Sequence, residues 1–304
     1  MDATPAANAK TELWPSLPLE EWQDTYATLH MWTQIVGKIR LTLAPPVNHW
    51  WHCALHLSPV GLTTTPMPYK GKLLEIEFDF IEHKLIIRTS DEITRLIELA
   101  PRTVADFYRE IMSTLESLNY PVKIFTKPQE VPNPIPFEND TEHASYDPEY
   151  ANRLWRIVAR AAVIFEQFRG RFIGKCSPVS FYWGSFDLAV TRFSGRPAPP
   201  RPGADLITRE AYSHECISAG FWPGGGFKGP AFYSYTAPAP EGLQDQPIPN
   251  GFYSTDLSEF VLLYDDVRNS NSPKDHLMQF LQGTYEAGAN LAKWDRVSLE
   301  RKIQ

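Results

Sequence analysis

Hydrophobic side chains recur at helical spacing in two long segments of the chain. The recurrence begins at Trp22 in residues 19–38 and at Trp155 in residues 148–170. A repeat every three or four residues places such side chains on one face of a helix. A glycine followed by a basic residue closes each segment, as is usual at helix C-termini. We therefore expect two long helices, the first of which ends near Gly37.

Helix start signals support these segments and two more. Asp147 is a good N-cap for the second long helix, because its carboxylate can accept hydrogen bonds from the first free backbone N–H groups. Thr103 gives a weaker capping pattern for a helix over residues 102–118, and Ser272 gives one for a helix over residues 273–293.

Alternating apolar and polar residues predict antiparallel strands between these helices. The expected strands are residues 48–57, 73–81, 84–89, 93–99, 181–191, 231–235 and 259–264. A two-residue turn at Glu82-His83 would join two of them into a hairpin. The cross-strand pairs expected from that turn are Phe80 with Leu85, Phe78 with Ile87, and Glu77 with Arg88. This arrangement puts apolar pairs on one face of the sheet and a charge pair on the other.

The two parts of the chain resemble each other. When the sequence is shifted by 133 positions without a gap (155 − 22 = 133), Trp22 meets Trp155 and Trp50 meets Trp183, with further matches around them. Tryptophan is rare, so two such matches in one register favour an internal duplication over coincidence.

These patterns predict an α+β fold of two pseudo-repeats, each a helix, an antiparallel sheet of about four strands and a second helix, packed as one body. The expected divisions are a disordered tail at 1–13, a first repeat at 14–126, a Pro-rich and acidic crossing segment at 127–146, and a second repeat at 147–304. Proline and glycine cluster within 197–251, which we expect to be a loop insertion.

Composition and charge narrow the functions to consider. The formal net charge is −7, which argues against a nucleic-acid surface because such surfaces are basic. No hydrophobic run reaches the roughly 20 residues of a membrane helix, so we expect no membrane partner. The cysteines Cys53, Cys176 and Cys216 are widely spaced and lack metal-binding pairs. Reduced thiols in the cytoplasm are the expected state, and the oligomeric state is left open.

The strand expected at 48–57 would place Trp50 and His52 on one face. In the equivalent strand Trp183 and Asp187 share that face. Aromatic walls with a few polar groups are typical of small-molecule pockets. Trp50 and Trp183 are therefore candidate ligand-binding residues, with His52 as a candidate general base and Asp187 as its orienting carboxylate.

A second set of candidates lies further along the chain. His214 and Glu215 are adjacent and could form another acid–base pair. The most basic stretch of this acidic chain includes Lys175 and Arg192, which could bind a carboxylate or phosphate. We interpret these two residues as candidate ligand-binding charges.

Metal and nucleotide sites are not expected. His52 and His56 would share a strand face but stand about 13 Å apart, too far to share one ion. The glycine-rich motif at 224–229 has no following helix to bind a pyrophosphate. The stretch at 170–176 is one residue short of a phosphate loop. We expect no metal, and the cofactor remains unknown.

Several long segments resemble an uncharacterised, mostly bacterial family, domain-of-unknown-function family 5996. The segments are Ala27–Lys38, Asn48–His52, Gly170–Ser194, Arg209–Glu215 and Phe221–Gly224. The resemblance extends from about Trp14 to Leu299, and it implies one coherent full-length unit. It implies no activity, cofactor or catalytic residue.

Three functional hypotheses follow. The first is a small-molecule enzyme that uses His and carboxylate acid–base chemistry. The second is a non-catalytic protein that binds a small ligand or anion between tryptophan faces. The third is a structural protein whose aromatic surface forms an oligomer interface. The first requires His52, Asp187, His214 and Glu215 to converge on one pocket.

Overall fold

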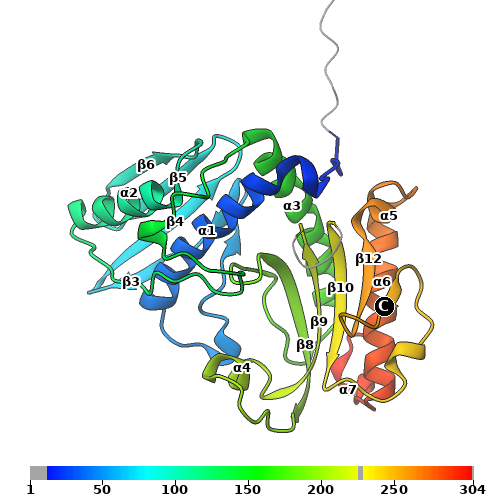
Figure 1. The fold of residues 1–304 in the computed structure, drawn as a ribbon. Helices are drawn as coiled ribbons and strands as arrows, with labels where there is room; N and C mark the ends of the chain where they lie inside the picture. Colours follow the sequence, from blue (N-terminus) through cyan, green and yellow to red (C-terminus); the bar gives the residue numbers. More distant parts are fainter. Residues whose placement is uncertain (1–11, 225–228, 303–304) are drawn as a thin grey trace, which may run out of the picture.

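A computed structural model describes residues 12–224 and 229–302 (Figure 1). It has the expected α+β architecture, with two antiparallel sheets of six strands each among the described residues. Most of the expected tail, and residues 225–228 of the glycine-rich motif, lie outside the described ranges. None of the described helices is both long and apolar enough to span a bilayer.

The first half begins with α1 (Leu19–Leu43) and ends with α2 (Val104–Ser117). Its sheet has the order β1-β2-β4-β5-β6, with β3 paired to β4. The strands are β1 (His56–Leu57), β2 (Gly61–Thr63), β3 (Met67–Tyr69), β4 (Lys72–Asp79), β5 (Lys84–Thr89) and β6 (Thr94–Glu98). The capping pattern of α2 is confirmed, because Thr103 accepts a hydrogen bond from the backbone N–H of Asp106.

The hairpin of β4 and β5 differs from its prediction by two residues. Phe78 pairs with Leu85 instead of Ile87, and the turn has four residues instead of two. Asp79 explains the longer turn, because its Oδ1 accepts hydrogen bonds from the backbone N–H groups of Ile81 and Glu82, each at 2.8 Å. A shift of two residues keeps every side chain on its expected face.

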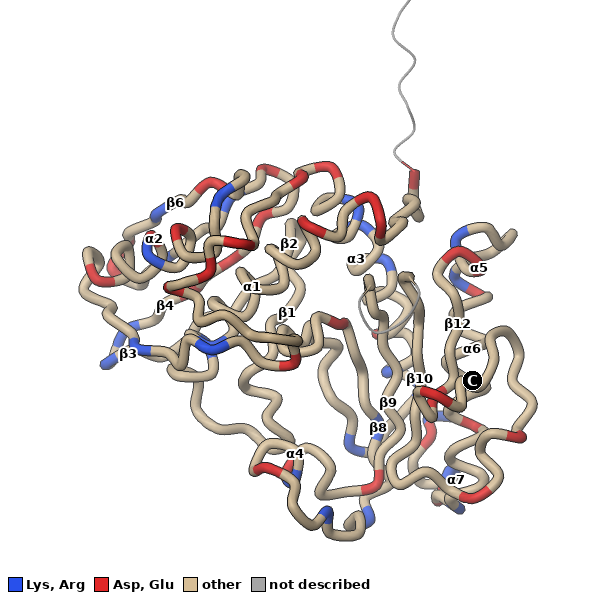
Figure 2. The backbone as a smooth tube through the Cα atoms, in the orientation of Figure 1, with Lys and Arg blue, Asp and Glu red and all other residues tan. Residues whose placement is uncertain are grey.

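The second half begins with α3 (Pro148–Gly170), which Asp147 caps as expected. Its sheet has the order β11-β12-β10-β9-β8-β7. The strands are β7 (Ser180–Tyr182), β8 (Asp187–Pro197), β9 (His214–Trp222), β10 (Ala231–Ala237), β11 (Phe252–Ser254) and β12 (Glu259–Leu263). The remaining helices are α4 (Leu206–Ala211), α5 (Tyr264–Arg268), α6 (Pro273–Leu291) and α7 (Arg296–Leu299). Figure 1 shows α3 and α6 beside this sheet, and charged residues of both signs are interspersed over both halves (Figure 2).

Three sequence-based expectations about strands and loops are wrong. Residues 48–57 form a short 3-10 helix and a turn before β1 rather than one strand. Residues 181–191 form a hairpin, because a turn at 183–186 separates β7 from β8. Residues 197–251 are not one loop insertion, because β9 and β10, two central strands of the second sheet, lie within them, and only 231–235 of this range was expected as a strand.

The first long helix also continues beyond its predicted end at Gly37 and stops at Leu43. Gly37 does not end the helix. It allows the Trp183 ring to pack closely against it. A Cβ atom at this position would lie 2.2 Å from Cδ1 of Trp183, so only glycine lets the indole ring rest on the helix. This contact joins the two halves of the chain.

The halves meet again where their sheet edges approach. Leu55, which precedes β1, and Phe181 in β7 exchange two backbone hydrogen bonds, of 2.9 and 2.8 Å. The crossing segment is held on α1 by Gln34, whose side chain exchanges hydrogen bonds with the backbone of Gln129. These contacts fix the turn before β1, the turn after β7 and the crossing segment around one region, which contains the cavity described next.

Candidate functional site

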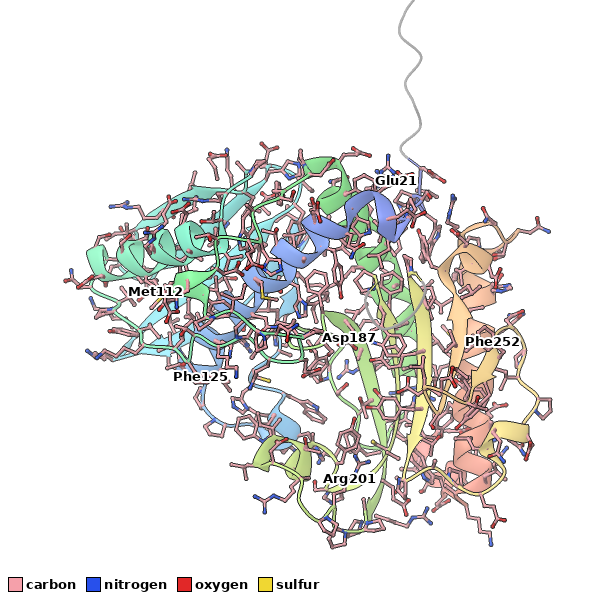
Figure 3. The ribbon with its side chains drawn as sticks, viewed as in Figure 1. Glu21, Met112, Phe125, Asp187, Arg201 and Phe252 are labelled. Carbon is pink, nitrogen blue, oxygen red and sulfur yellow. The ribbon has the colours of Figure 1, made fainter. Side chains whose placement is uncertain are left out.

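A cavity of about 460 Å³ lies on the face of the second sheet that is turned away from α3 and α6. Successive side chains of β8 point to opposite faces of the sheet. Asp187, Ala189 and Thr191 line the cavity, whereas Leu188 and Val190 belong to the hydrophobic core on the other side. The other walls come from the turn before β1 (His49, Trp50, Trp51 and Cys53), α4, the turn after β7 and the crossing segment. Asp187 lies near the centre of the molecule in Figure 3.

Asp187 is a buried carboxyl group that two hydrogen bonds hold in the cavity. It is 4% exposed, Ser185 donates a hydrogen bond of 2.5 Å to its Oδ1, and the hydroxyl of Tyr233 donates one to its Oδ2. Tyr233 belongs to β10 and reaches across β9 over Gly220, where a Cβ atom would lie 2.3 Å from the tyrosine oxygen. Burial raises the pKa of Asp187, and the two hydrogen bonds oppose that shift.

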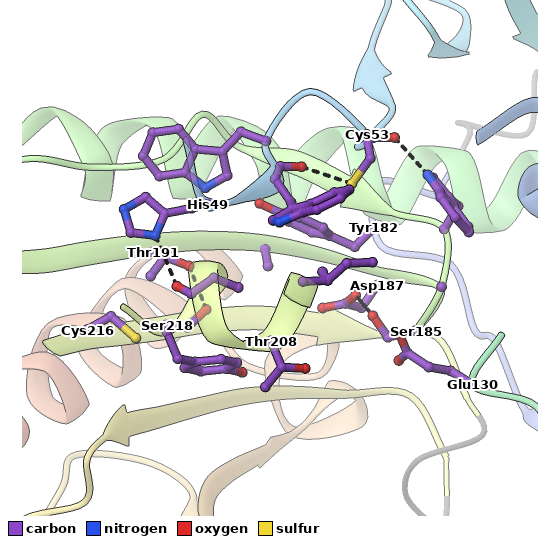
Figure 4. Close-up of a pocket in the computed structure, with 18 of the residues that line it drawn as sticks. His49, Cys53, Glu130, Tyr182, Ser185, Asp187, Thr191, Thr208, Cys216 and Ser218 are labelled. Carbon is purple, nitrogen blue, oxygen red and sulfur yellow. Dashed lines mark hydrogen bonds between the residues drawn. The ribbon is translucent and has the colours of Figure 1, made fainter. Parts of the chain in front are cut away.

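Two further carboxyl groups interact with Asp187. Glu130 lines the cavity from the crossing segment, and its Oε1 lies against Gly184. Partial burial, followed by the charge of Asp187, raises the pKa of Glu130. The same two causes raise the pKa of Glu259, on β12, to about 7. One end of the cavity is therefore acidic. Figure 4 shows Asp187, Ser185 and Glu130 together at this end.

The opposite end is formed by the turn before β1. His49 and Trp50 have φ angles of 56° and 61°, in the left-handed region that non-glycine residues seldom adopt. This backbone lets His49, Trp50 and the following Trp51 all line the cavity, which three consecutive residues of a strand could not do. Their sequence alternation resembles that of a strand, and this is why the prediction for 48–57 fails.

The hydrogen bonds of His49 fix its tautomer. Its Nδ1 lies 3.1 and 3.0 Å from the carbonyl oxygens of Glu210 and Ala211, at the end of α4. Carbonyl oxygens only accept, so Nδ1 carries a proton, and Nε2 accepts from Lys175 Nζ at 2.5 Å. Burial lowers the pKa of His49, and the charge of Lys175 adds to that effect. His49 is thus held neutral and connects Lys175 to α4.

The remaining wall is largely aromatic. The aromatic lining residues are Trp50, Trp51, Tyr182, Trp183, Phe193, Tyr212, Tyr233 and Tyr235. Trp183 Nε1 donates a 2.7 Å hydrogen bond to the carbonyl oxygen of Cys53. The buried Nε1 of Trp50 has no hydrogen-bond partner among the described residues.

Two thiols also line the cavity. Burial raises the pKa of Cys53 to about 11 and that of Cys216 to about 12. Both are therefore protonated at neutral pH, and a protonated thiol is a poor nucleophile.

The residues that sequence analysis selected divide into two groups. Trp50, Trp183 and Asp187 line the cavity. His52 does not: it is buried in its own turn, where its Nδ1 accepts a 3.1 Å hydrogen bond from the backbone N–H of Val47. Its ring does lie beside that of Trp50, with 5.2 Å between centroids, but the strand that was expected to bring it to the cavity does not form.

The other selected residues lie outside the cavity lining. His214 packs edge-on against His49, with 5.7 Å between ring centroids. Glu215 binds Arg196, with 2.6 Å between Oε2 and Nη2. Lys175 reaches the cavity wall from behind: it donates to His49, and its Nζ lies 5.7 and 5.4 Å from the ring centroids of Trp51 and Phe193. Arg192 lies on the opposite face of β8, where its fully buried guanidinium stacks between aromatic rings of the core.

Sequence reasoning missed Glu130, Tyr233 and His49 as site residues. Tyr233 had a usable signal, because alternation along the expected strand 231–235 places Tyr233 and Tyr235 on one face. Glu130 had none, because the irregular crossing segment gives no periodicity from which to orient a side chain. Among the described residues, no group of three His, Cys, Asp or Glu side chains is placed to hold a metal ion.

Comparison with known proteins places this fold in a family. Residues 14–301 match the model of a family described as being of unknown function, DUF5996. The chain belongs to this family. The DUF5996 match covers nearly the whole chain and confirms the resemblance seen in the sequence segments. No curated protein and no solved structure matches the chain significantly.

Proposed function

We propose that this protein binds a small organic molecule in the cavity on the second sheet. The observation that carries the proposal is the composition of the wall: a contiguous aromatic lining with a small number of fixed polar groups at its two ends. A volume of about 460 Å³ lies within the usual range for small-molecule sites. The indole N–H of Trp50, which has no partner in the part of the chain that the structure describes, offers a further donor to a ligand.

Binding without catalysis is the function that the geometry supports best. Of the four residues that the acid–base hypothesis requires, only Asp187 lines the cavity. The imidazole that does line the cavity, His49, lies at the other end and has both nitrogens engaged by α4 and Lys175. The thiols of Cys53 and Cys216 are protonated at neutral pH. A preorganised ligand site is a simpler use of this arrangement than a catalytic one.

Acid–base catalysis is the second candidate, and one observation favours it. Asp187 is a buried carboxyl with a raised pKa, hydrogen-bonded to Tyr233 in a cavity, as in carboxylic acids that donate or accept a proton during catalysis. The test is whether any compound that binds the cavity is chemically altered over hours by the protein and not by Asp187→Asn.

An oligomer interface built on the tryptophans has less support. Trp183 is only 5% exposed and rests on Gly37, so it does not present an apolar surface to a partner.

We also infer that the two halves arose by duplication, because each runs from a long helix through a six-stranded antiparallel sheet to a second helix. A cytoplasmic location is proposed from the three free cysteines.

A ligand-observed NMR screen of soluble fragments tests the proposal. Wild-type protein is compared with Ala189→Phe, which places a large side chain on the cavity floor. Val163→Phe is the control, because Val163 is 59% exposed on α3. We expect fragments to bind wild type and Val163→Phe and to lose binding to Ala189→Phe. Fragments that bind all three proteins equally, or none, would contradict the proposal.

A further inference from the structure

We propose that the ligand of this cavity is an organic cation, whose positive group lies between the aromatic wall and the carboxyl groups of Asp187 and Glu130. This inference rests on the proposed function and adds the chemical class of the ligand. It follows from the charges that line the cavity, from the aromatic side chains facing them, and from the way in which the acidic end is held.

The charged groups of the lining have one sign. Among the lining residues that the structure describes, Glu130 and Asp187 carry carboxyl groups, and none is Lys or Arg. The cations that lie against the lining from outside already have partners. Lys175 donates to His49, Lys38 beside the Trp183 ring donates to the carbonyl oxygen of Lys127, and Arg201 stacks on Tyr212. An anionic ligand would meet two carboxyl groups without a lining cation to pair with. A cationic ligand would find two partners.

The aromatic side chains of the cavity wall are the second feature that favours a cationic ligand. Aromatic faces attract ammonium groups through their quadrupoles, and tryptophan does so most strongly. Trp50, Trp51 and Trp183 line the cavity together with Tyr182, Tyr212 and Tyr235. An aromatic wall with carboxylates is the usual construction of sites for alkylated ammonium groups, because the rings replace water without forming hydrogen bonds that such groups cannot make.

Hydrogen bonds hold the carboxyl groups of the acidic end in place. Asp187 is fixed by Ser185 and Tyr233, which occupy one lone pair on each carboxylate oxygen. Glu130 is brought to the cavity because the neighbouring Gln129 is bound to Gln34 on α1. Burial raises the pKa of both carboxyl groups, and the charge of Asp187 raises that of Glu130 further. A cation bound beside them offsets the repulsion of Glu130 by Asp187, and this gain is added to its affinity.

Choline and 3,3-dimethylbutan-1-ol form a matched pair of probes, because they differ only in a charged nitrogen in place of a carbon. Both are titrated into the full chain and followed by NMR, with benzoate as the anionic probe. We expect choline to bind about tenfold or more tightly than the alcohol, and benzoate not to bind. Glu130→Gln should weaken choline binding severalfold and leave the alcohol unchanged, whereas Glu98→Gln, on an exposed position of β6, should change neither.

The outcomes separate this inference from the proposed function. If the alcohol or benzoate binds as tightly as choline and Ala189→Phe abolishes the binding, the cavity binds ligands but the ligand is not a cation. If choline does not bind wild type, or binds Ala189→Phe equally well, the cation site is also refuted. Thr208→Trp, which blocks the cavity from α4, provides the same test if Ala189→Phe does not fold.

Discussion

Tyr233 donates a hydrogen bond to Asp187 from two strands away. The tyrosine lies on β10 and the aspartate on β8, and the ring crosses β9 at Gly220. Trp222 stacks on the same ring, with 4.3 Å between centroids. The contact makes the position of the buried carboxyl depend on a side chain that no local pattern connects to it.

Gly220→Ala should displace Tyr233 from Asp187. The added Cβ would lie 2.3 Å from the tyrosine oxygen and 2.4 Å from a ring carbon. Overpacking of this kind costs about 1–3 kcal/mol of the free energy of unfolding, which chemical denaturation would measure. Tyr233→Phe is the companion variant, because it removes only the hydroxyl. If Gly220→Ala is as stable as wild type, Tyr233 does not lie over this position.

Gly37→Ala should destabilise the protein, whereas Gly170→Ala should not. The two glycines are equivalent in the 133-residue register, but only Gly37 lies beneath Trp183. The first substitution should cost about 1–3 kcal/mol. The second meets no atom within 4 Å and should leave stability unchanged or raise it by up to about 1 kcal/mol. Equal effects at both positions would contradict the contact between Gly37 and Trp183.

We expect the ionisation of Glu259 to lower the free energy of unfolding as the pH rises. Its pKa is about 7 in the folded protein against an ordinary 4.5, so the folded state holds a proton that the unfolded state releases. The resulting stabilisation is fully present below pH 4.5 and is lost between about pH 4.5 and 7. Glu259→Gln should therefore be more stable than wild type at pH 8, by about 1–2 kcal/mol given the partial exposure of the group.

Wild type and Glu259→Gln should have the same free energy of unfolding near pH 4.5. Urea denaturation at a series of pH values would measure the difference between them. Glu98→Gln provides a control carboxyl on an exposed position of β6. A difference between Glu259→Gln and wild type that does not vary with pH would show that Glu259 has an ordinary pKa.

Arg192→Ala should destabilise the protein without changing its affinity for the ligand. The guanidinium lies 3.4 Å from the Phe168 ring centroid and 4.3 Å from that of Tyr285, on the face of β8 opposite to the cavity. Removing so large a buried side chain should cost about 3 kcal/mol or more, measured by denaturation. In the folded fraction, choline affinity should match that of wild type. A loss of affinity at unchanged stability would restore Arg192 as a ligand-binding residue.

The helices and the class of fold could be predicted because their signals are local. Asp147 caps α3 as expected, and the buried stripe from Val104 to Leu115 orients α2. The cavity could be predicted only in part. Asp187 was found by strand alternation, which holds along β8.

The rest of the site depends on contacts between distant segments. His49 and Trp50 adopt left-handed backbone angles in a turn that α4 and Lys175 hold from far along the chain. Glu130 is positioned through Gln34, 96 residues earlier (130 − 34 = 96). No periodicity in the sequence reports such contacts, and this explains why His52 was selected where His49 lines the cavity.

The indole NMR resonances provide the most direct test of the cation site. The chain has nine tryptophans, and each gives one Nε1–H signal. On titration with choline, we expect the signals of Trp50, Trp51 and Trp183 to shift together along one binding curve, while that of Trp32, which is buried in the first half, stays in place. Unchanged signals for the three cavity tryptophans at saturating choline would contradict the account.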